Sequence, residues 1–285
     1  MDLNVIEILK SILFGIVEGI TEWLPISSTG HLILLNEVVT LNASESFWSM
    51  FEVVIQLGAI LAVVVLFWNQ IFPFGKRDNK HPLAGRGIGA YIKTDIFVLW
   101  FKIIAACIPA VIAMIFNDEF EEMFYNYQTV SVALIVFGIA FIWVESRNKG
   151  KAPKVKSLSE ISYQLAFLIG VFQLIAAVFP GTSRSGATIV GALLFGVSRT
   201  AAAEFTFFLA IPAMVGASLL KLLKFGFVFT GEELVILLVG MVTAFVVSVV
   251  VIRFLMGYIK KHDFKVFGWY RIALGIAVLA VFTLI

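Results

Sequence analysis

Charged residues are scarce in this 285-residue chain: Asp, Glu, Lys and Arg make up 14% of it, whereas 60% of residues are hydrophobic. Soluble domains carry about 25% charged and about 45–50% apolar residues, so these side chains cannot all be hidden in one water-soluble core. The single cysteine, Cys107, excludes an internal disulfide and a cysteine-based zinc site. A net charge of +2 gives no sign of nucleic-acid binding. The composition therefore predicts an all-α integral membrane protein with lipids as its surroundings.

Six apolar runs approach or reach the length of about 17–25 residues that a helix needs to cross a bilayer. They are 51–68, 96–116, 130–144 (slightly short), 205–223, 234–255 and 268–285. The remaining apolar pieces form two pairs, at about 5–40 and 161–197. In each pair a Ser/Gly-rich loop, at 25–30 or 180–186, precedes a piece of about ten residues, at about 31–39 or 187–197. As a helix, such a piece is only about 15 Å long. We predict six transmembrane helices and two re-entrant hairpins.

Basic residues cluster in three loops, at 70–95, 146–160 and 257–267. If both hairpins return to their own side, all three loops lie on one face, and basic loops usually face the cytoplasm. Both termini are then expected to be periplasmic. An acidic run lies in a predicted outer loop, and we interpret it as a solvated surface rather than a metal site. Its members are Asp118, Glu119, Glu121 and Glu122.

The two hairpins resemble each other. The alignment pairs Gly15 with Gly170, Glu18 with Gln173, Pro25 with Pro180, Ser28 with Ser183 and, roughly, Glu52 with Glu204. Each half of the single domain, 1–145 and 161–285, reads as a hairpin followed by three spans. Because three is odd, the second copy must be inverted, and broken helices of inverted repeats meet near the membrane midplane.

Glu18 and Glu22 share one face of an otherwise apolar helix, where like charges repel. Placing an ionisable group at mid-membrane depth costs about 2.5–3.5 kcal/mol on insertion scales. The two carboxylates are therefore candidates for a general base, a metal site, or a partner for Arg184. The alternative is that both lie near the aqueous end of the helix and are simply hydrated.

Both loops are suited to binding an anion at a helix start, where free backbone amides point outward. In the first loop, Ser and Thr also suit a helix cap, and His31 is either functional or a hydrogen-bonded interfacial residue. In the second loop, Arg184 can grip a phosphate with two hydrogen bonds, or it can form a structural bridge to a glutamate. The candidate phosphate-binding residues are Ser27, Thr29, Gly30, Gly181, Thr182, Ser183, Arg184, Ser185, Gly186 and Thr188. By contrast, Arg199, Arg253 and Arg271 are expected to be snorkelling anchors at helix ends.

Residues 18–31 and 179–188, with a third stretch at 51–58, resemble the signatures of the undecaprenyl-diphosphate phosphatase family, also called bacitracin-resistance protein. The similarity runs from about residue 5 to the C-terminus. It implies a hydrolase of the bacterial inner membrane that converts a polyprenyl diphosphate lipid, undecaprenyl diphosphate, to undecaprenyl phosphate and inorganic phosphate. It further implies recycling of the lipid carrier for peptidoglycan synthesis and cell shape, bacitracin resistance, and an active site open to the periplasmic side.

For such a reaction, Ser28 is the preferred nucleophile, with Glu22 as general base and Glu18 in support. His31 is the rival nucleophile or a proton donor, and direct attack by water is a third route. Arg184 would hold the diphosphate, because phosphoryl transfer depends mainly on positioning and electrostatics. Supporting roles are assigned to Glu52, Gln56 and Gln173.

Three questions stay open in the sequence. Glu18 and Glu22 would be the ligands if the site takes Mg²⁺ or Ca²⁺, since hard cations prefer oxygen. The inverted repeat is also typical of transporters, so a flippase for polyprenyl phosphate is the rival function. A structural scaffold would leave the polar residues without a role, and self-association as a homodimer is a further hypothesis.

Overall fold

The computed structural model describes residues 4–75, 79–115, 117–124 and 126–284, and gives the backbone alone at 114, 115, 117, 118, 121, 122 and 282–284. Throughout these ranges the chain is mainly helical, with three isolated β-bridges, such as Val155↔Val197, and no strand. The expected all-α membrane protein is confirmed.

Five helical segments in the described ranges are long and apolar enough to cross a membrane. They are Glu45–Leu66, which is α3 (Glu45–Val54) followed by α4 (Gln56–Leu66), α6 (Thr94–Ile115), α8 (Tyr127–Asn148), α11 (Arg199–Phe225) and α12 (Gly231–Tyr258). A sixth helix, α13 (Lys265–Leu284), has 20 residues. The run at 130–144 looked short because α8 continues at both ends through polar residues, including Ser146, Arg147 and Asn148.

The two predicted hairpins correspond to two pairs of helices. The first pair is α1 (Val5–Thr21) and α2 (Ser28–Val38), and the second is α9 (Tyr163–Val178) and α10 (Arg184–Leu194). The short helices begin three residues earlier than the expected starts at 31 and 187. The reason is that Ser27 and Ser183 act as N-caps, which places Ser28 and Arg184 inside the first helical turn.

Short helices also occupy the connections between the long ones. They are α5 (Trp68–Ile71), α7 (Asn117–Phe124), η1 (Gly87–Tyr91) and η2 (Leu158–Glu160). The segment at 117–128 was expected to be a loop, so α7 corrects that prediction. In α7, Glu119 is exposed, whereas the side chains of Asp118, Glu121 and Glu122 lie outside the described residues. The choice between a solvated surface and a metal site there stays a prediction.

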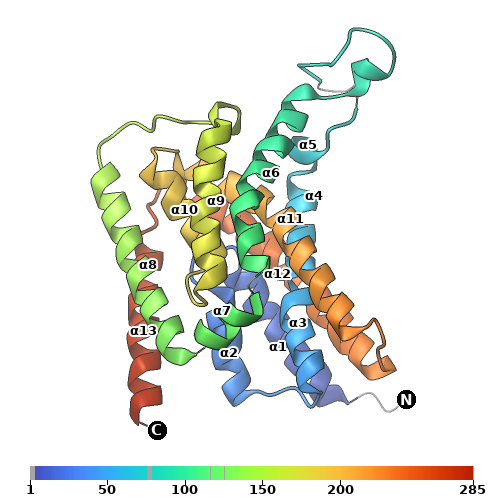
Figure 1. Cartoon of the computed structure of the whole chain (residues 1–285), viewed down its shortest axis with the longest axis vertical. Helices are drawn as coiled ribbons and strands as arrows, with labels where there is room; N and C mark the ends of the chain where they lie inside the picture. Colours follow the sequence, from blue (N-terminus) through green and yellow to red (C-terminus); the bar gives the residue numbers. More distant parts are fainter. Residues whose placement is uncertain (1–3, 76–78, 116, 125, 285) are drawn as a thin grey trace.

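Long helices from one half of the chain pack against helices from the other half (Figure 1). Helix α1 packs along α12, α9 along α6, and α8 along α13, so each pair joins one helix from each half. Two crossings depend on glycine: a Cβ at Gly15 would lie 2.6 Å from the Gly240 carbonyl oxygen, and one at Gly170 would lie 2.1 Å from that of Ala106. Because Gly15 and Gly170 are also paired in the sequence repeat, the same device holds each long hairpin helix against the opposite half.

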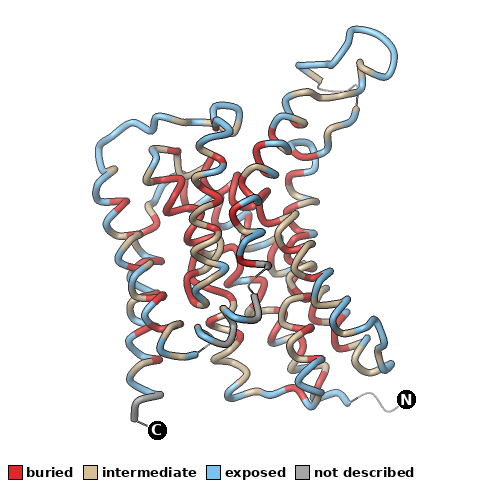
Figure 2. The backbone as a smooth tube through the Cα atoms, in the orientation of Figure 1, coloured by how far each residue is buried: buried red, intermediate tan, exposed pale blue. Residues whose placement is uncertain are grey.

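Burial is concentrated where these helices meet (Figure 2). Many of the exposed side chains on these helices are large and hydrophobic. Large hydrophobic side chains such as Phe101, Val242 and Trp269 are more than half exposed. Exposed apolar area of this kind on helices of membrane-spanning length is what contact with lipid requires. The loops α5–α6 and α8–α9 lie at one end of the molecule, and both termini lie at the other (Figure 1).

Candidate active site

Glu22 and Arg184, from the two Ser/Gly-rich loops, form an ion pair. Arg184 Nη2 lies 2.6 Å from Glu22 Oε1, and the side chains are 17% and 6% exposed. A second contact joins the same loops, because Ser185 Oγ donates to the backbone oxygen of Glu22 at 3.1 Å. The end of α1 and the start of α10 are therefore held together by a buried charge pair, which is one of the alternatives that the sequence left open for Arg184.

Ser28 uses the other oxygen of the same carboxylate. Its hydroxyl donates to Glu22 Oε2 at 2.6 Å, and the residue is buried at the first position of α2. Glu22 thus contacts a hydroxyl on one side and a guanidinium on the other. A carboxylate within hydrogen-bond reach of a hydroxyl has the geometry of a general base and its nucleophile.

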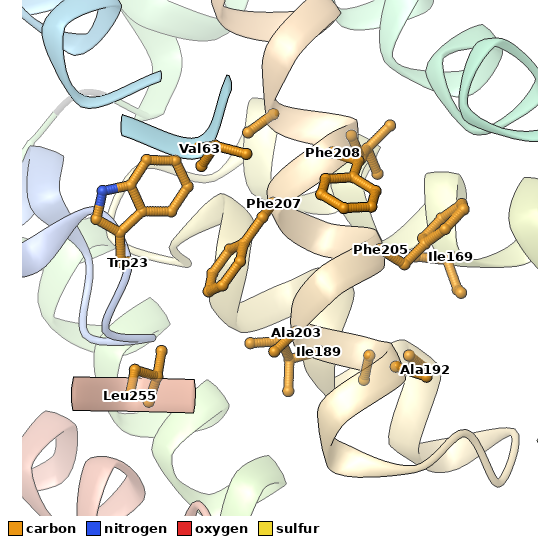
Figure 3. Close-up of a cluster of buried hydrophobic side chains, with 14 of the residues drawn as sticks. Trp23, Val63, Ile169, Ile189, Ala192, Ala203, Phe205, Phe207, Phe208 and Leu255 are labelled. Carbon is orange, nitrogen blue, oxygen red and sulfur yellow. The ribbon is translucent and has the colours of Figure 1, made fainter. Parts of the chain in front are cut away.

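Trp23 anchors the loop that carries Glu22. Its ring is fully buried and meets Phe207 of α11 edge-on, with ring centroids 5.1 Å apart and an interplanar angle of 88° (Figure 3). Val63 of α4 and Phe208 belong to the same apolar cluster. A large aromatic side chain held in this way fixes the backbone of the residue next to it.

Glu18 lies one turn before Glu22 on α1 and is fully buried. Neither of its carboxylate oxygens has a hydrogen-bond partner among the described residues. Two unpartnered oxygens beside the ion pair are free to accept a proton, a water molecule or a cation.

The carboxylates fit a divalent cation only in part. Within the described ranges, no group of three or more His, Cys, Asp or Glu side chains is placed to hold a metal ion. Glu18 offers two free oxygens, whereas those of Glu22 are engaged by Arg184 and Ser28. A hard cation usually takes six or more oxygen ligands, so the remaining ones would have to come from water and from phosphate.

Ser27 and Ser183 have the same unusual backbone conformation, with φ of 77° and 67°. Each accepts a hydrogen bond at Oγ from the amide three residues on, Gly30 at 3.3 Å and Gly186 at 3.1 Å. Left-handed non-glycine residues cost about 1–3 kcal/mol and cluster at functional sites. The caps also correct the repeat alignment, because Ser183 corresponds to Ser27 in conformation and not to Ser28.

The two capped helix starts leave backbone donors free. The amides of Ser28 and Thr29 in α2, and of Arg184 and Ser185 in α10, have no acceptor in the described part of the chain. Free amides at a helix N-terminus bind anions. Thr182 adds a buried hydroxyl without a partner among the described residues.

Other residues that were predicted to bind phosphate instead make hydrogen bonds or close contacts within the protein. Thr188 Oγ1 donates to the Arg184 carbonyl oxygen at 2.9 Å and lies 2.9 Å from Thr206 Oγ1, so it faces α11. Ser183 Oγ caps α10 and lies 3.2 Å from Ser185 Oγ. Gly181 has φ +88°, and a Cβ there would lie 2.6 Å from the Val130 carbonyl oxygen. Its role is therefore to let the loop backbone approach α8 closely.

His31 is fully hydrogen-bonded. Its Nδ1 lies 2.7 Å from the Ser27 carbonyl oxygen and its Nε2 lies 2.7 Å from the Tyr270 hydroxyl, with the two rings stacked at 6°. A carbonyl only accepts, so Nδ1 carries the proton, and in the neutral ring Nε2 accepts from Tyr270. This arrangement favours the hydrogen-bonded interpretation of His31 over the nucleophile.

Arg271 corrects the sequence analysis. It was expected to be a snorkelling anchor, but it is fully buried at the junction of the two loops. Its guanidinium donates to the carbonyl oxygens of Pro25 at 3.2 Å, Gly181 at 3.0 Å and Thr182 at 2.7 Å. Arg199 is also no free anchor, because it forms a two-point ion pair with Glu145. The available signal for Arg271 was a charge inside the apolar run 268–285.

The supporting residues are divided between two places. Gln173 is buried on α9, and its Oε1 has no partner among the described residues. Glu52 lines a cavity of about 460 Å³ together with Ser49 and Lys221, with walls from α2, α3 and the C-terminal part of α11. The α2–α3 connection and the C-terminal end of α11 lie at the end of the molecule that has the termini (Figure 1). Gln56 donates to the backbone oxygen of Glu52 at 3.4 Å and so lies one turn further along.

The fold and site define a class: an integral membrane protein whose two Ser/Gly-rich loops bring a carboxylate, a hydroxyl and a guanidinium together. Residues 11–277 match the family model described as Bacitracin resistance protein BacA, and the chain belongs to this family. The family resemblance of the sequence motifs is thereby confirmed.

Several bacterial proteins that are similar to this chain are named undecaprenyl-diphosphatase. The chain is 65% identical to an undecaprenyl-diphosphatase of Desulfitobacterium hafniense, over 98% of this chain and 97% of that protein. It is 61% identical to an undecaprenyl-diphosphatase of Lachnoclostridium phytofermentans and 58% identical to one of Enterococcus faecalis, each over 99% of both chains. The similarity therefore covers both loops and every spanning helix.

Proposed function

We propose that this protein is a membrane phosphatase that hydrolyses undecaprenyl diphosphate to undecaprenyl phosphate and inorganic phosphate. The observation that carries the proposal is Glu22, which contacts both Ser28 and Arg184. The names of the relatives, at 58–65% identity over nearly their full length, supply the substrate. Recycling of the lipid carrier for the cell wall and bacitracin resistance follow from this activity, since bacitracin sequesters the diphosphate.

In the first chemical step, Ser28 Oγ attacks the terminal phosphorus and Glu22 takes the hydroxyl proton. The bond from that phosphorus to the bridging oxygen breaks, and the bridging oxygen keeps the electron pair. Glu22 then gives its proton to this leaving group, and undecaprenyl phosphate departs. Water next attacks the phosphoserine, Glu22 accepts its proton and passes it to Ser28 Oγ, and phosphate is released. Each step reuses one carboxylate as base and acid.

Arg184 and the free amides of α2 and α10 hold the diphosphate and offset the charge that develops on it. Arg184 Nη1 is buried without a partner in the described part of the chain, so the guanidinium can bind phosphate while Nη2 keeps its ion pair. Positioning and charge stabilisation provide most of the catalysis in phosphoryl transfer. Direct attack by water would use the same groups, with Glu22 as its base.

A bound Mg²⁺ or Ca²⁺ would be held by Glu18, with Glu22 as the second carboxylate, and would neutralise charge on the diphosphate. Glu18 is suited to this because its two oxygens have no other hydrogen-bond partner among the described residues. If the proposal holds, a chelator lowers phosphate release, added Mg²⁺ restores it, and Glu18→Gln raises the Mg²⁺ concentration needed. Release that is unchanged by the chelator would contradict a cation at this site.

In the proposed architecture, α1–α2 and α9–α10 are re-entrant hairpins of an inverted repeat, and α13 is the sixth span. The packing of α1 against α12 and of α9 against α6 supports this arrangement, because each pair joins the two halves of the chain. The basic loops face the cytoplasm of a bacterial inner membrane, both termini are periplasmic, and the active site opens to the periplasm. The cavity at Glu52, at the end with the termini, supports an outward opening.

Phosphate release by the purified protein in detergent, given undecaprenyl diphosphate, tests the proposed function. We expect release that requires Glu22 and Arg184. The rival function, a flippase for polyprenyl phosphate, needs a polar path open to both faces. Lipid movement across vesicles without phosphate release would replace the phosphatase by that transporter.

A further inference from the structure

A second polar pocket lies at the opposite end of α10 from Arg184. It has a volume of about 690 Å³, and its walls come from the ends of α8, α10 and α12, the loop after α8 and the start of α11. Since α10 has 11 residues, about 16 Å of helix separates this pocket from the candidate active site. A volume of this size lies within the range of about 300–1,000 Å³ that is usual for ligand sites.

The charges that line this pocket are mostly positive. Glu145 is the one carboxylate among the lining residues. The five cationic side chains that line the pocket are Arg147, Lys151, Lys154, Arg199 and Lys260. Glu145 is already engaged at both carboxylate oxygens, because it accepts from Arg199 Nε at 2.8 Å, Arg199 Nη2 at 2.6 Å and the Phe264 amide at 3.0 Å. Among the described residues, neither Lys151 nor Lys154 has a carboxylate partner.

The lysine-bearing wall is built into the fold. The Lys154 amide donates to the Gly196 carbonyl oxygen at 2.8 Å, and the Ser198 amide donates to the Val155 carbonyl oxygen at 2.8 Å. These bonds tie the α8–α9 loop to the segment between α10 and α11. The excess of basic residues on one face follows from membrane topology alone, but topology does not require a cavity with hydrogen-bonded walls.

Backbone donors also point to an anion. The amides of Arg199 and Thr200, the first two of α11, have no acceptor within the described ranges, and both residues line the pocket. The N-terminal end of this helix of 27 residues adds positive potential. Arg199 Nη1 is not used in the ion pair with Glu145 and has no acceptor in the part of the chain that the structure describes, so it is a further donor.

We propose that this pocket binds a phosphate group, carried by a lipid headgroup or present as free phosphate, separately from the site at Glu22 and Arg184. The apolar side chains of Leu194, Phe195 and Ile259 line the same pocket and leave room for hydrocarbon attached to the phosphate. Lysine and arginine side chains around a helix start match the charge and the hydrogen-bond acceptors of phosphate.

The test uses the full chain, purified in an uncharged detergent, with Arg184→Ala in every sample to weaken binding at the candidate active site. The pocket variant is Lys151→Gln/Lys154→Gln. The matched control, Lys80→Gln/Arg86→Gln, removes two exposed charges from another basic loop. One arm measures the rise in unfolding temperature with sodium phosphate against sodium chloride at equal ionic strength. The other counts bound phosphatidic acid against phosphatidylcholine by native mass spectrometry.

The proposal expects binding in at least one arm, retained by the control and weakened about five- to tenfold in the pocket variant, because two exposed cations are lost. Weakening in the phosphate arm identifies free phosphate, and weakening confined to phosphatidic acid identifies a lipid headgroup. Absence of binding in both arms, unchanged affinity in the pocket variant, or equal losses in the two variants would each overturn the proposal.

Discussion

Ser28 Oγ donates to Glu22 Oε2 at 2.6 Å across a turn of five intervening residues. The contact joins Glu22, the first residue after α1, to the first residue of α2, and the same carboxylate receives Arg184 from the second loop. Because the hydroxyl and its base are already in contact, little rearrangement is needed for proton transfer.

Ser28→Ala should lower kcat by about 100-fold or more, because it removes the attacking oxygen in the covalent route. The measurement is phosphate release from undecaprenyl diphosphate, with acid quenching to trap a phosphoserine. Ser146→Ala is the matched control, since Ser146 is an exposed serine near the end of α8 and its hydroxyl donates to the Ile142 carbonyl oxygen. A loss below about tenfold for Ser28→Ala, without trapped phosphoserine in the parent protein, would exclude this nucleophile and favour direct attack by water.

His31→Gln should cost less activity than Ser28→Ala, because both ring nitrogens already serve the hydrogen bonds to Ser27 and Tyr270. Tyr270→Phe removes one of those bonds and should have a similar or smaller effect. Both variants are compared by kcat and by unfolding temperature. An acid-labile phosphohistidine in the parent protein that disappears in His31→Gln would reverse the assignment and make His31 the nucleophile.

Arg271→Ala should destabilise the protein by about 3 kcal/mol or more, since it leaves buried carbonyl oxygens of both loops without a donor. Phosphate release should fall as well, because those carbonyls belong to Pro25, Gly181 and Thr182. Arg253→Ala is the control, since Arg253 is exposed and lies in another spanning helix. Equal unfolding temperatures for the two variants in the same detergent would refute the loop-holding role of Arg271.

Gly181→Ala should be more destabilising than Gly150→Ala, although both positions have positive φ. Each substitution meets the left-handed penalty of about 1–2 kcal/mol. Only at position 181 would the new Cβ also lie 2.6 Å from a backbone oxygen, that of Val130, whereas nothing lies within 4 Å at position 150. The comparison of unfolding temperatures isolates this close approach, and equal shifts would show that the loop can move away from α8.

The sequence predicted the helices and the paired loops because both depend on local patterns. Apolar runs placed the spans, and the two short pieces could be recognised by length alone, although their starts were expected at 31 and 187, three residues too late. The repeat alignment failed by one residue at Ser28, since only the backbone conformation shows that Ser27 and Ser183 are the equivalent caps.

The role of Arg271 could not be predicted, because it depends on which backbone carbonyls surround the side chain after folding. A pattern of residue types places an arginine in a helix but does not show its tertiary partners. The same limit applies to His31, whose second hydrogen bond goes to Tyr270, 239 residues away. By contrast, a contact of Arg184 with Glu18 or Glu22 was among the alternatives that the sequence offered, since a buried arginine and a buried glutamate each need a partner, and the structure has it at Glu22.

The most direct test of the account is a double-mutant cycle for phosphate release with Glu22→Gln, Arg184→Ala and the combined variant, each purified as a folded protein. We expect each single substitution to lower kcat/KM by about 1,000-fold and the double variant to be little worse than either, because residues that act as a unit give non-additive losses. Activity close to that of the parent protein in either single variant, or losses that simply multiply, would contradict a site made where the two loops meet.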